Sequence, residues 1–145
     1  MPNRNVSNRQ VMMREEETSP ERTAGSQFDG QKYLAIESYR KDGEAVRTPV
    51  WFIEKEGTLF VRTDNDTGKV KRIRRSPNIR IAVCSMRGEP KGAWIDAQAK
   101  FASEEEAERA YQLLKQKYGL QYRLIRFIDR IQGRKSKAVC LAIKA

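Results

Sequence analysis

The sequence predicts a single α+β domain that is mainly β, in which about six antiparallel strands close into a barrel beside two to three helices. Short stretches that alternate apolar and polar residues recur from residue 33 onward, and tight-turn dipeptides separate several of them. Helical periodicity is confined to three segments between the strands. The 145 residues are 39% hydrophobic and 33% charged, which is enough apolar material for one ordinary core.

A meander of three strands opens the domain. An Asp42-Gly43 turn joins strands predicted over Tyr33–Arg40 and Ala45–Glu54, because this dipeptide favours the tight turn of a hairpin. A second turn at Glu56-Gly57 leads into a strand over Leu59–Thr63. These closely spaced strands predict antiparallel pairing.

Three further strands are predicted over Ile79–Ser85, Trp94–Phe101 and Lys137–Lys144. The two cysteines, Cys84 and Cys140, fall within two of them and are too far apart in sequence for a CxxC redox or zinc pair. We therefore expect both to be reduced and buried in strands.

Helical patterns occupy the gaps between these strands. The first runs from Thr67 to Ser76, where Pro77 stops it. The second begins with the capping pair Ser103 and Glu106 and ends near Gly119. The third, Tyr122–Ile131, carries an apolar stripe with arginines facing elsewhere.

Residues 1–27 are polar, and we expect a flexible arm there, with residues 28–145 forming the domain. The sequence shows neither a signal peptide nor a run of about 18 apolar residues, so we expect a cytoplasmic protein without a membrane segment. The chain contains no histidine, which excludes a histidine-based triad, a histidine general base and a histidine-ligated zinc site. No metal site is predicted.

The sharpest local feature is a cationic run at residues 68–75, Gly-Lys-Val-Lys-Arg-Ile-Arg-Arg, at the start of the first helix. Helix starts attract anions through unpaired N–H groups and the positive end of the dipole, and Gly68 admits close approach. Lys69 and Arg72 lie on about the same face. Three readings stay open: a site for a small phosphate ligand, a solvated basic helix, and a nucleic-acid surface extended by residues 123–137.

Arg47-Thr48-Pro49-Val50-Trp51-Phe52 is an unusual strand sequence. Pro49 cannot donate to a ladder, so it implies an edge strand, a bulge or a departure from the sheet. A freed edge offers backbone groups to a ligand, although a plain edge strand with Trp51 in the core is an equally ordinary reading. The strand end Arg62-Thr63 likewise fits an ordinary surface position.

Taken in order, several segments of this chain resemble the pyridoxamine 5′-phosphate oxidase-like flavin and deazaflavin oxidoreductases, especially the branch that uses coenzyme F420. The resemblance covers about Phe28 to Ala145. Ser38 and Thr67 depart from the family pattern, where Thr and Ser are commoner, but both keep a hydroxyl. The segments that carry the resemblance are Tyr39–Gly43, Thr48–Phe52, Phe60–Thr63, Gly68–Arg72, Pro77 and Arg87-Gly88.

The resemblance implies a split β-barrel homodimer with cofactor sites at the dimer interface. It places the cofactor ring along Arg47, Thr48, Pro49, Val50 and Trp51. It places the phosphate at Arg62, Thr63, Gly68 and Lys69, with Arg72 beside them, and brings Arg87 and Trp94 from the partner subunit.

The function implied is hydride transfer between coenzyme F420 and an unidentified small organic substrate, without a catalytic side chain, because such a cofactor carries its own reactive atom. The net charge of +10 would attract a polyglutamate tail on F420. An FMN-dependent oxidase or reductase of the same fold is one alternative. A basic nucleic-acid-binding domain without enzymatic activity is another.

Overall fold

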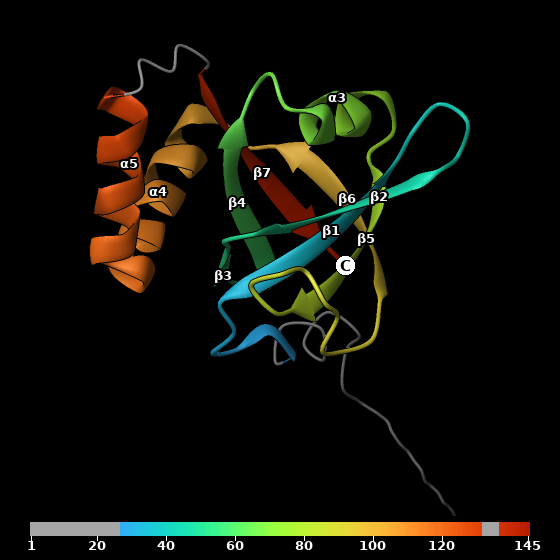
Figure 1. Ribbon diagram of the computed structural model, residues 1–145, viewed down its shortest axis with the longest axis horizontal. Helices are drawn as coiled ribbons and strands as arrows, with labels where there is room; N and C mark the ends of the chain where they lie inside the picture. The colour runs from blue at the N-terminus through green and yellow to red at the C-terminus, as the bar shows by residue number, and fades with distance from the viewer. Residues whose placement is uncertain (1–26, 132–136) are drawn as a thin grey trace, which may run out of the picture.

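The computed structural model describes residues 27–131 and 137–145 and confirms the mainly β, α+β class (Figure 1). The sheet has seven strands in the order β2-β1-β5-β6-β7-β4-β3, with every neighbouring pair antiparallel, and it curls into a half-barrel. The elements in chain order are β1 (Tyr33–Tyr39), β2 (Ala45–Val50), β3 (Ile53–Lys55), β4 (Thr58–Asp64), α3 (Gly68–Arg75), β5 (Asn78–Cys84), β6 (Ile95–Phe101), α4 (Glu104–Tyr118), α5 (Leu120–Ile131) and β7 (Ala138–Lys144).

The segment Ala45–Glu54, expected as one strand, is instead two strands that pair at opposite edges of the sheet. β2 ends at Val50 and pairs with β1, whereas β3 begins at Ile53 and pairs with β4. Trp51 and Phe52 carry the chain between the two edges, so the sheet has one strand more than expected. Pro49 lies in the edge strand β2, the kind of strand in which a residue without an N–H is tolerated.

The buried side chains form two clusters, a larger one inside the curled sheet and a smaller one between the sheet and α4, to which Leu114 belongs. Strand alternation turns one face of each strand inward, and burying each large apolar side chain contributes about 1.5–3 kcal/mol. The largest fully buried apolar side chains are Phe28, Leu34, Ile36, Phe52, Val61, Ile73, Ile81, Leu114, Leu141 and Ile143.

Helix α3 lies against β1 at one end of the barrel (Figure 1). Its N-cap is Thr67, whose Oγ1 accepts from the N–H of Val70 at 3.3 Å. Val70 and Ile73 are buried, and the helix ends before Ser76, as expected from Pro77. Val70 and Ile73 anchor α3 to the barrel, so its basic side chains are not needed for packing and can bind a ligand.

Helices α4 and α5 lie side by side on the outside of the barrel, where α4 packs on β3, β4 and β7 (Figure 1). The expected capping box of Ser103 and Glu106 is present. Gly119 ends α4 with a positive φ of 54°, a conformation that glycine adopts readily, and α5 begins at once at Leu120. The start expected at Tyr122 is therefore two residues late, because this turn needs only one residue.

Cys84 in β5 and Cys140 in β7 are unpaired and buried, as expected. Burial raises the pKa of Cys140 to about 11 and also raises the pKa of Cys84. Neither thiol is therefore an activated nucleophile. The arm expected over residues 1–27 lies outside the described residues except for Gln27.

Candidate functional site

The start of α3 gathers Gly68, Lys69 and Arg72. The Arg72 side chain folds back over the first turn, and a Cβ built on Gly68 would lie 2.8 Å from Arg72 Nη1. Arg72 Nε donates to Ser38 Oγ of β1 at 2.7 Å. The Ser38 hydroxyl therefore has a definite use, since it anchors this guanidinium at the helix start.

Lys69 is half-buried beside this arginine. Burial and then the Arg72 guanidinium lower the pKa of Lys69, while the carboxylate of Asp64 raises it. Burial, Arg40 and Arg75 likewise lower the pKa of Arg72. Two cations held close together at a helix N-terminus gain from a bound anion, because it offsets both their mutual repulsion and their lost hydration.

A second group of predicted residues lines a cavity of about 240 Å³ between the barrel and α5. Pro49, Val50 and Trp51 come from the end of β2 and the segment after it, and Arg62 comes from β4. The remaining lining residues, which the sequence reasoning missed, are Leu114, Tyr122, Ile125 and Arg126 of α4 and α5. The periodicity of α5 predicted which of its residues share a face, but it could not predict which face lies against the barrel.

The crossing at Trp51 and Phe52 is held by α4. The Trp51 ring stacks on Tyr118, with ring centroids 4.4 Å apart and planes 7° apart. Tyr118 Oη accepts from the N–H of Phe52 at 3.0 Å and donates to the carbonyl of Lys32 at 2.7 Å, and burial raises its pKa to about 12. Lys117 Nζ donates to the carbonyl of Phe52 at 2.8 Å. These contacts fix the cavity wall that Trp51 provides.

Strand β4 connects the two groups. Arg62 and Asp64 point to the same side of the sheet, about 7 Å apart by the strand repeat, and Asp64 interacts electrostatically with Lys69. Arg62 also places its guanidinium 5.3 Å from the ring centre of Tyr111. Thr63 points to the opposite side and is buried, so it does not line the cavity.

Arg47 is held away from the cavity. Its Nε donates to Glu37 Oε2 at 2.7 Å, Arg80 Nε donates to Glu37 Oε1 at 2.7 Å, and both guanidinium groups lie over the ring of Trp94. Arg80 and then the Tyr39 hydroxyl are the largest hydrogen-bonding causes that lower the pKa of Glu37, to about 2. Trp94 contacts these two arginines of its own chain, and its expected reach to a site in the partner subunit stays a prediction. Arg87 lies exposed in the loop after β5.

Thr48 Oγ1 is the buried side-chain oxygen or nitrogen atom that has no hydrogen-bond partner among the described residues. An unpaired buried hydroxyl costs about 1–3 kcal/mol, and it lies in the segment expected to hold a ring. The atom is therefore available to a polar group of a ligand or to a water molecule.

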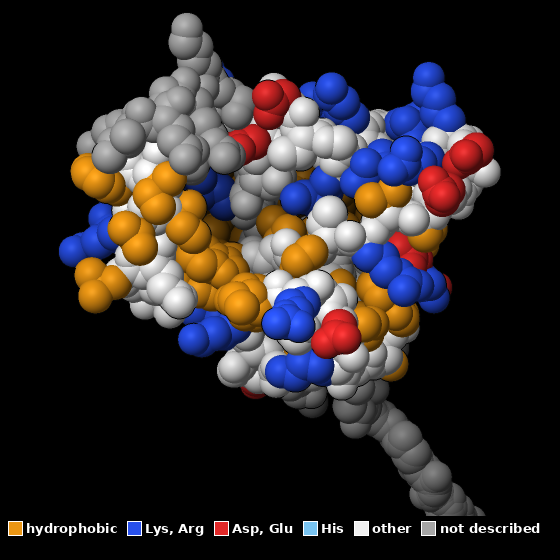
Figure 2. All heavy atoms as spheres, viewed as in Figure 1, with side chains coloured by type: hydrophobic (Ala, Val, Ile, Leu, Met, Phe, Trp, Pro, Cys, Tyr) orange, Lys and Arg blue, Asp and Glu red, His pale blue; other side chains and the backbone are white. Residues whose placement is uncertain are grey.

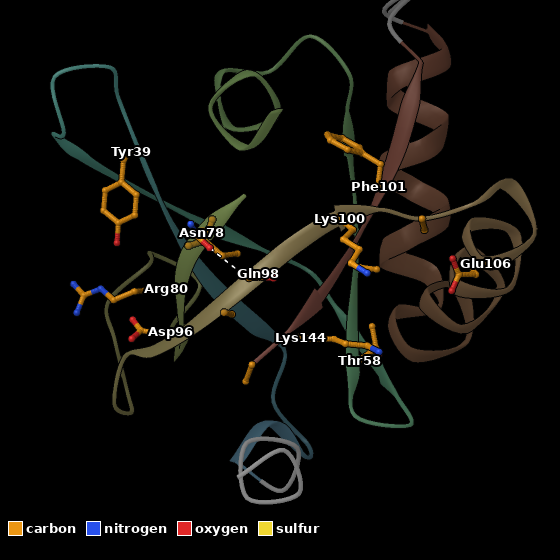
Figure 3. Close-up of a pocket in the computed structure, with 15 residues that line it drawn as sticks. Tyr39, Thr58, Asn78, Arg80, Asp96, Gln98, Lys100, Phe101, Glu106 and Lys144 are labelled. Carbon is orange, nitrogen blue, oxygen red and sulfur yellow. Dashed lines mark hydrogen bonds between the residues drawn. The ribbon is translucent and has the colours of Figure 1, made fainter. Parts of the chain in front are cut away.

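A larger cavity of about 790 Å³ lies over β5 and β6 (Figure 3). Tyr39, Arg80 and Asp96 surround one end, and Lys100 and Lys144 lie toward the other (Figure 3). The cavity collects no residue predicted for the site. Size alone therefore does not identify the functional site.

Within the described residues, no group of three or more Cys, Asp and Glu side chains is arranged to hold a metal ion. No helix in that part of the chain is long and apolar enough to span a membrane.

Comparison with known proteins identifies a family. The family profile described as pyridoxamine 5′-phosphate oxidase matches residues 23–144. No protein with a curated description matches the chain.

Several solved structures share the fold at low identity. A candidate pyridoxamine 5′-phosphate oxidase from Listeria innocua is 17% identical, with a TM-score of 0.59 over 86% of this chain and 92% of that one. A heme storage protein from Vibrio cholerae is 13% identical, with a TM-score of 0.61 over 84% and 87% of the two chains. An F420 reductase is 15% identical, with a TM-score of 0.50 over 82% and 90%.

Proposed function

The chain belongs to the pyridoxamine 5′-phosphate oxidase family, and from that premise we propose that it is an oxidoreductase transferring hydride between coenzyme F420 and a small organic substrate. The observation that carries the proposal is the pair of half-buried cations at the start of α3, where Arg72 folds back over Gly68 beside Lys69. The family includes oxidoreductases, and a protein named F420 reductase shares the fold.

The residues present fit such a cofactor at both ends. The phosphate is bound by the Gly68 and Lys69 amides, the Lys69 ammonium and the Arg72 guanidinium. Arg62 and Thr63, expected there as well, point to opposite sides of the adjoining strand end, so one of these two side chains at most faces the phosphate. The ring lies along Thr48–Trp51, where the Thr48 hydroxyl lacks a partner. Arg47 acts on this segment through the strand it anchors, because its guanidinium is already bound to Glu37.

The deazaflavin supplies the atom that accepts or donates hydride. The chain's own residues bind, orient and exclude water. Lys69 and Arg72 fix one end of the ligand, and the stacked Trp51 and Tyr118 rings support the wall against which the other end rests. A chain without histidine therefore lacks nothing that this chemistry requires.

We further propose that the protein acts as a homodimer. The cavity beside Trp51 has about 240 Å³, below the roughly 300–1,000 Å³ of sites that enclose a drug-sized ligand or cofactor, so a second subunit would complete it. Apolar side chains gather on the outer face of α5 (Figure 2), where Leu120, Leu124, Phe127 and Ile128 are exposed. An uncovered apolar helix face of this kind suits a subunit contact.

FMN is the alternative cofactor, since the same phosphate and ring contacts suit a flavin. The net charge of +10 favours F420, because a polyglutamate tail gains from a positive field. Heme is a poorer fit: the chain has no histidine ligand, and both cysteines are buried. The heme storage protein therefore contributes the fold alone to the comparison.

Titration with F420 and with FMN, each followed by cofactor fluorescence, tests the proposal. We expect saturable binding that is tighter for F420, and hydride transfer only in its presence. If FMN binds more tightly than F420, the proposed cofactor becomes FMN, and the fold assignment does not change.

A second titration, with single-stranded and duplex oligonucleotides at two salt concentrations, tests the nucleic-acid alternative. Micromolar, steeply salt-dependent oligonucleotide binding without either cofactor would overturn the enzymatic proposal.

A further inference from the structure

The cavity beneath α5 contains two arginines that come from distant parts of the chain. Arg62 belongs to β4 and Arg126 to α5, and both line the same 240 Å³ space. Among the described residues, neither guanidinium is paired with a carboxylate, and the contact found for Arg62 is the face of the Tyr111 ring. Among the described residues, the cavity lining therefore carries two positive charges and no carboxylate, and the nearest acid along β4, Asp64, lies outside it.

The rest of the cavity wall is apolar or aromatic. Pro49, Val50 and Trp51 form one side, and Leu114 and Ile125 come from the helices opposite. Such walls favour a flat or compact apolar body, while the arginines favour an anionic group attached to it.

The proposed cofactor accounts for only part of this charge. Lys69 and Arg72 already serve the phosphate at the α3 start, and Arg62 lies on the strand that leads there. Arg126, an exposed residue whose side chain lines the cavity, is the other cation there, and the proposed phosphate contacts do not include it. It also lies on the side of α5 that faces the barrel, opposite the exposed stripe that contains Leu124 and Phe127.

We propose that Arg126 binds a carboxylate of the organic substrate, so that the enzyme acts on small organic anions with an apolar body. The inference rests on the proposed function, because it concerns the substrate that lies beside the cofactor. Arg126 is a binding residue that no sequence motif indicated.

Trp51 offers a direct measurement, because it lines the cavity and the chain has only two tryptophans. The variant Trp94→Phe leaves Trp51 as the single tryptophan. Its fluorescence would be titrated with benzoate and with benzamide, which share a ring but differ in charge. Calorimetry of the unaltered protein with the same two compounds repeats the comparison without any substitution.

We expect benzoate to bind at least about tenfold more tightly than benzamide, as a hydrogen bond to a charged group allows. Arg126→Leu should remove that preference and Arg126→Lys should restore part of it. Arg123→Leu should leave the preference unchanged, because Arg123 is exposed on the same helix, as Arg126 is, but does not line the cavity. Equal affinities for the two probes, or equal losses at Arg123 and Arg126, would overturn the inference.

Repeating the benzoate titration with saturating F420 separates this inference from the proposed function. Benzoate that still binds supports a substrate site beside the cofactor. Competition between benzoate and F420 would assign Arg126 to the cofactor, overturning the substrate inference while the proposed function stands. Failure of both F420 and FMN to bind would overturn the proposed function, whatever benzoate does.

Discussion

Lys69 occupies a position where a positive charge is costly in the empty protein and useful in the bound one. It is half-buried, and burial and Arg72 both lower its pKa. The binding form is the protonated ammonium, so ligand affinity is complete below that lowered pKa and is lost as the pH rises through it. A phosphate bound beside Lys69 stabilises the ammonium, and so opposes the lowering of its pKa by burial and by Arg72.

Changing Lys69 to Ala should weaken cofactor binding by about 1.5–3 kcal/mol, or roughly 10- to 150-fold, the range for a hydrogen bond to a charged group. Circular dichroism should show an unchanged fold, and fluorescence titration gives the affinity. Lys71→Ala is the matched control, because Lys71 is exposed on the same helix. Arg72→Ala should cause a smaller loss. Similar losses at Lys69 and Lys71 would indicate a diffuse field in place of a specific contact.

The Glu37 carboxylate links three neighbouring strands, β2, β1 and β5, through its hydrogen bonds. It is only 1% exposed and binds Arg47, Arg80 and the Tyr39 hydroxyl, one from each of β2, β5 and β1. Neutralising this buried carboxylate removes its charge-assisted hydrogen bonds to Arg47 and Arg80, whose side chains are partly exposed.

Glu37→Gln should lower the free energy of unfolding at neutral pH by roughly 1–3 kcal/mol. The folded pKa of about 2 lies below the ordinary 4.5, so the contribution is present above pH 4.5 and is lost as the pH falls through 2. Denaturant titrations between pH 2 and 7 should therefore show a shallower acid dependence in the variant. Glu44→Gln, which removes an exposed partner of Arg40, is the control and should change little. An unchanged acid limb in Glu37→Gln would contradict this assignment.

At the scale of elements, local turn chemistry made the hairpins and helix ends predictable. Asp42-Gly43, the Ser103 capping box and Gly119 act within a few residues, so sequence alone locates them. For the break at Trp51 and Phe52, Pro49 indicated an edge strand or a departure from the sheet, but not where the chain continues. The break depends on Tyr118, which is distant in sequence and replaces the sheet as the partner of the Phe52 N–H.

The candidate site likewise has one part that local sequence predicts and one part that depends on residues distant in sequence. The α3 start was predictable because a glycine, a cap and two cations fall within one short segment. Arg126 was not predictable, because its role requires knowing which face of α5 lies against the barrel. Arg47 is paired with Glu37 directly across the hairpin that the Asp42-Gly43 turn predicts, and its place along the ring stays a prediction.

Gly68→Ala tests α3 as a unit. The added Cβ would lie 2.8 Å from Arg72 Nη1, so the guanidinium must move from the helix start. Alanine favours the helix by about 0.4–1 kcal/mol, which offsets the loss of the Arg72–Ser38 hydrogen bond. We therefore expect a free energy of unfolding within about 1 kcal/mol of the original, together with roughly tenfold weaker cofactor binding.

A double-mutant cycle checks the cause of that loss. In the Arg72→Ala background, Gly68→Ala should weaken binding no further, because the displaced group is already absent. Additive losses would mean that the glycine acts on the ligand directly. Thermal denaturation and fluorescence titration supply the two measurements.

At the scale of the whole molecule, the net charge of +10 favours binding of an acidic ligand, whereas the apolar outer face of α5 favours contact with another subunit. The cavity lies on the opposite side of that helix, so a subunit docked on its outer face would also hold α5 in place over the cavity. Assembly and ligand binding are then coupled through one helix.

Phe127→Glu tests that coupling. Phe127 is 56% exposed in the middle of the apolar face of α5, and a carboxylate there would be buried without a partner in a dimer. We expect the dimer dissociation constant to rise by roughly 30- to 1,000-fold, as for a central interface residue, with weaker cofactor binding as the half-sites separate. Sedimentation over a range of protein concentrations measures the first effect and cofactor titration the second. Met86→Glu is the control, because Met86 is 69% exposed but lies in the loop after β5. A Phe127→Glu protein that stays dimeric and binds cofactor normally would place the subunit contact on another face, and coupling through α5 would then be wrong.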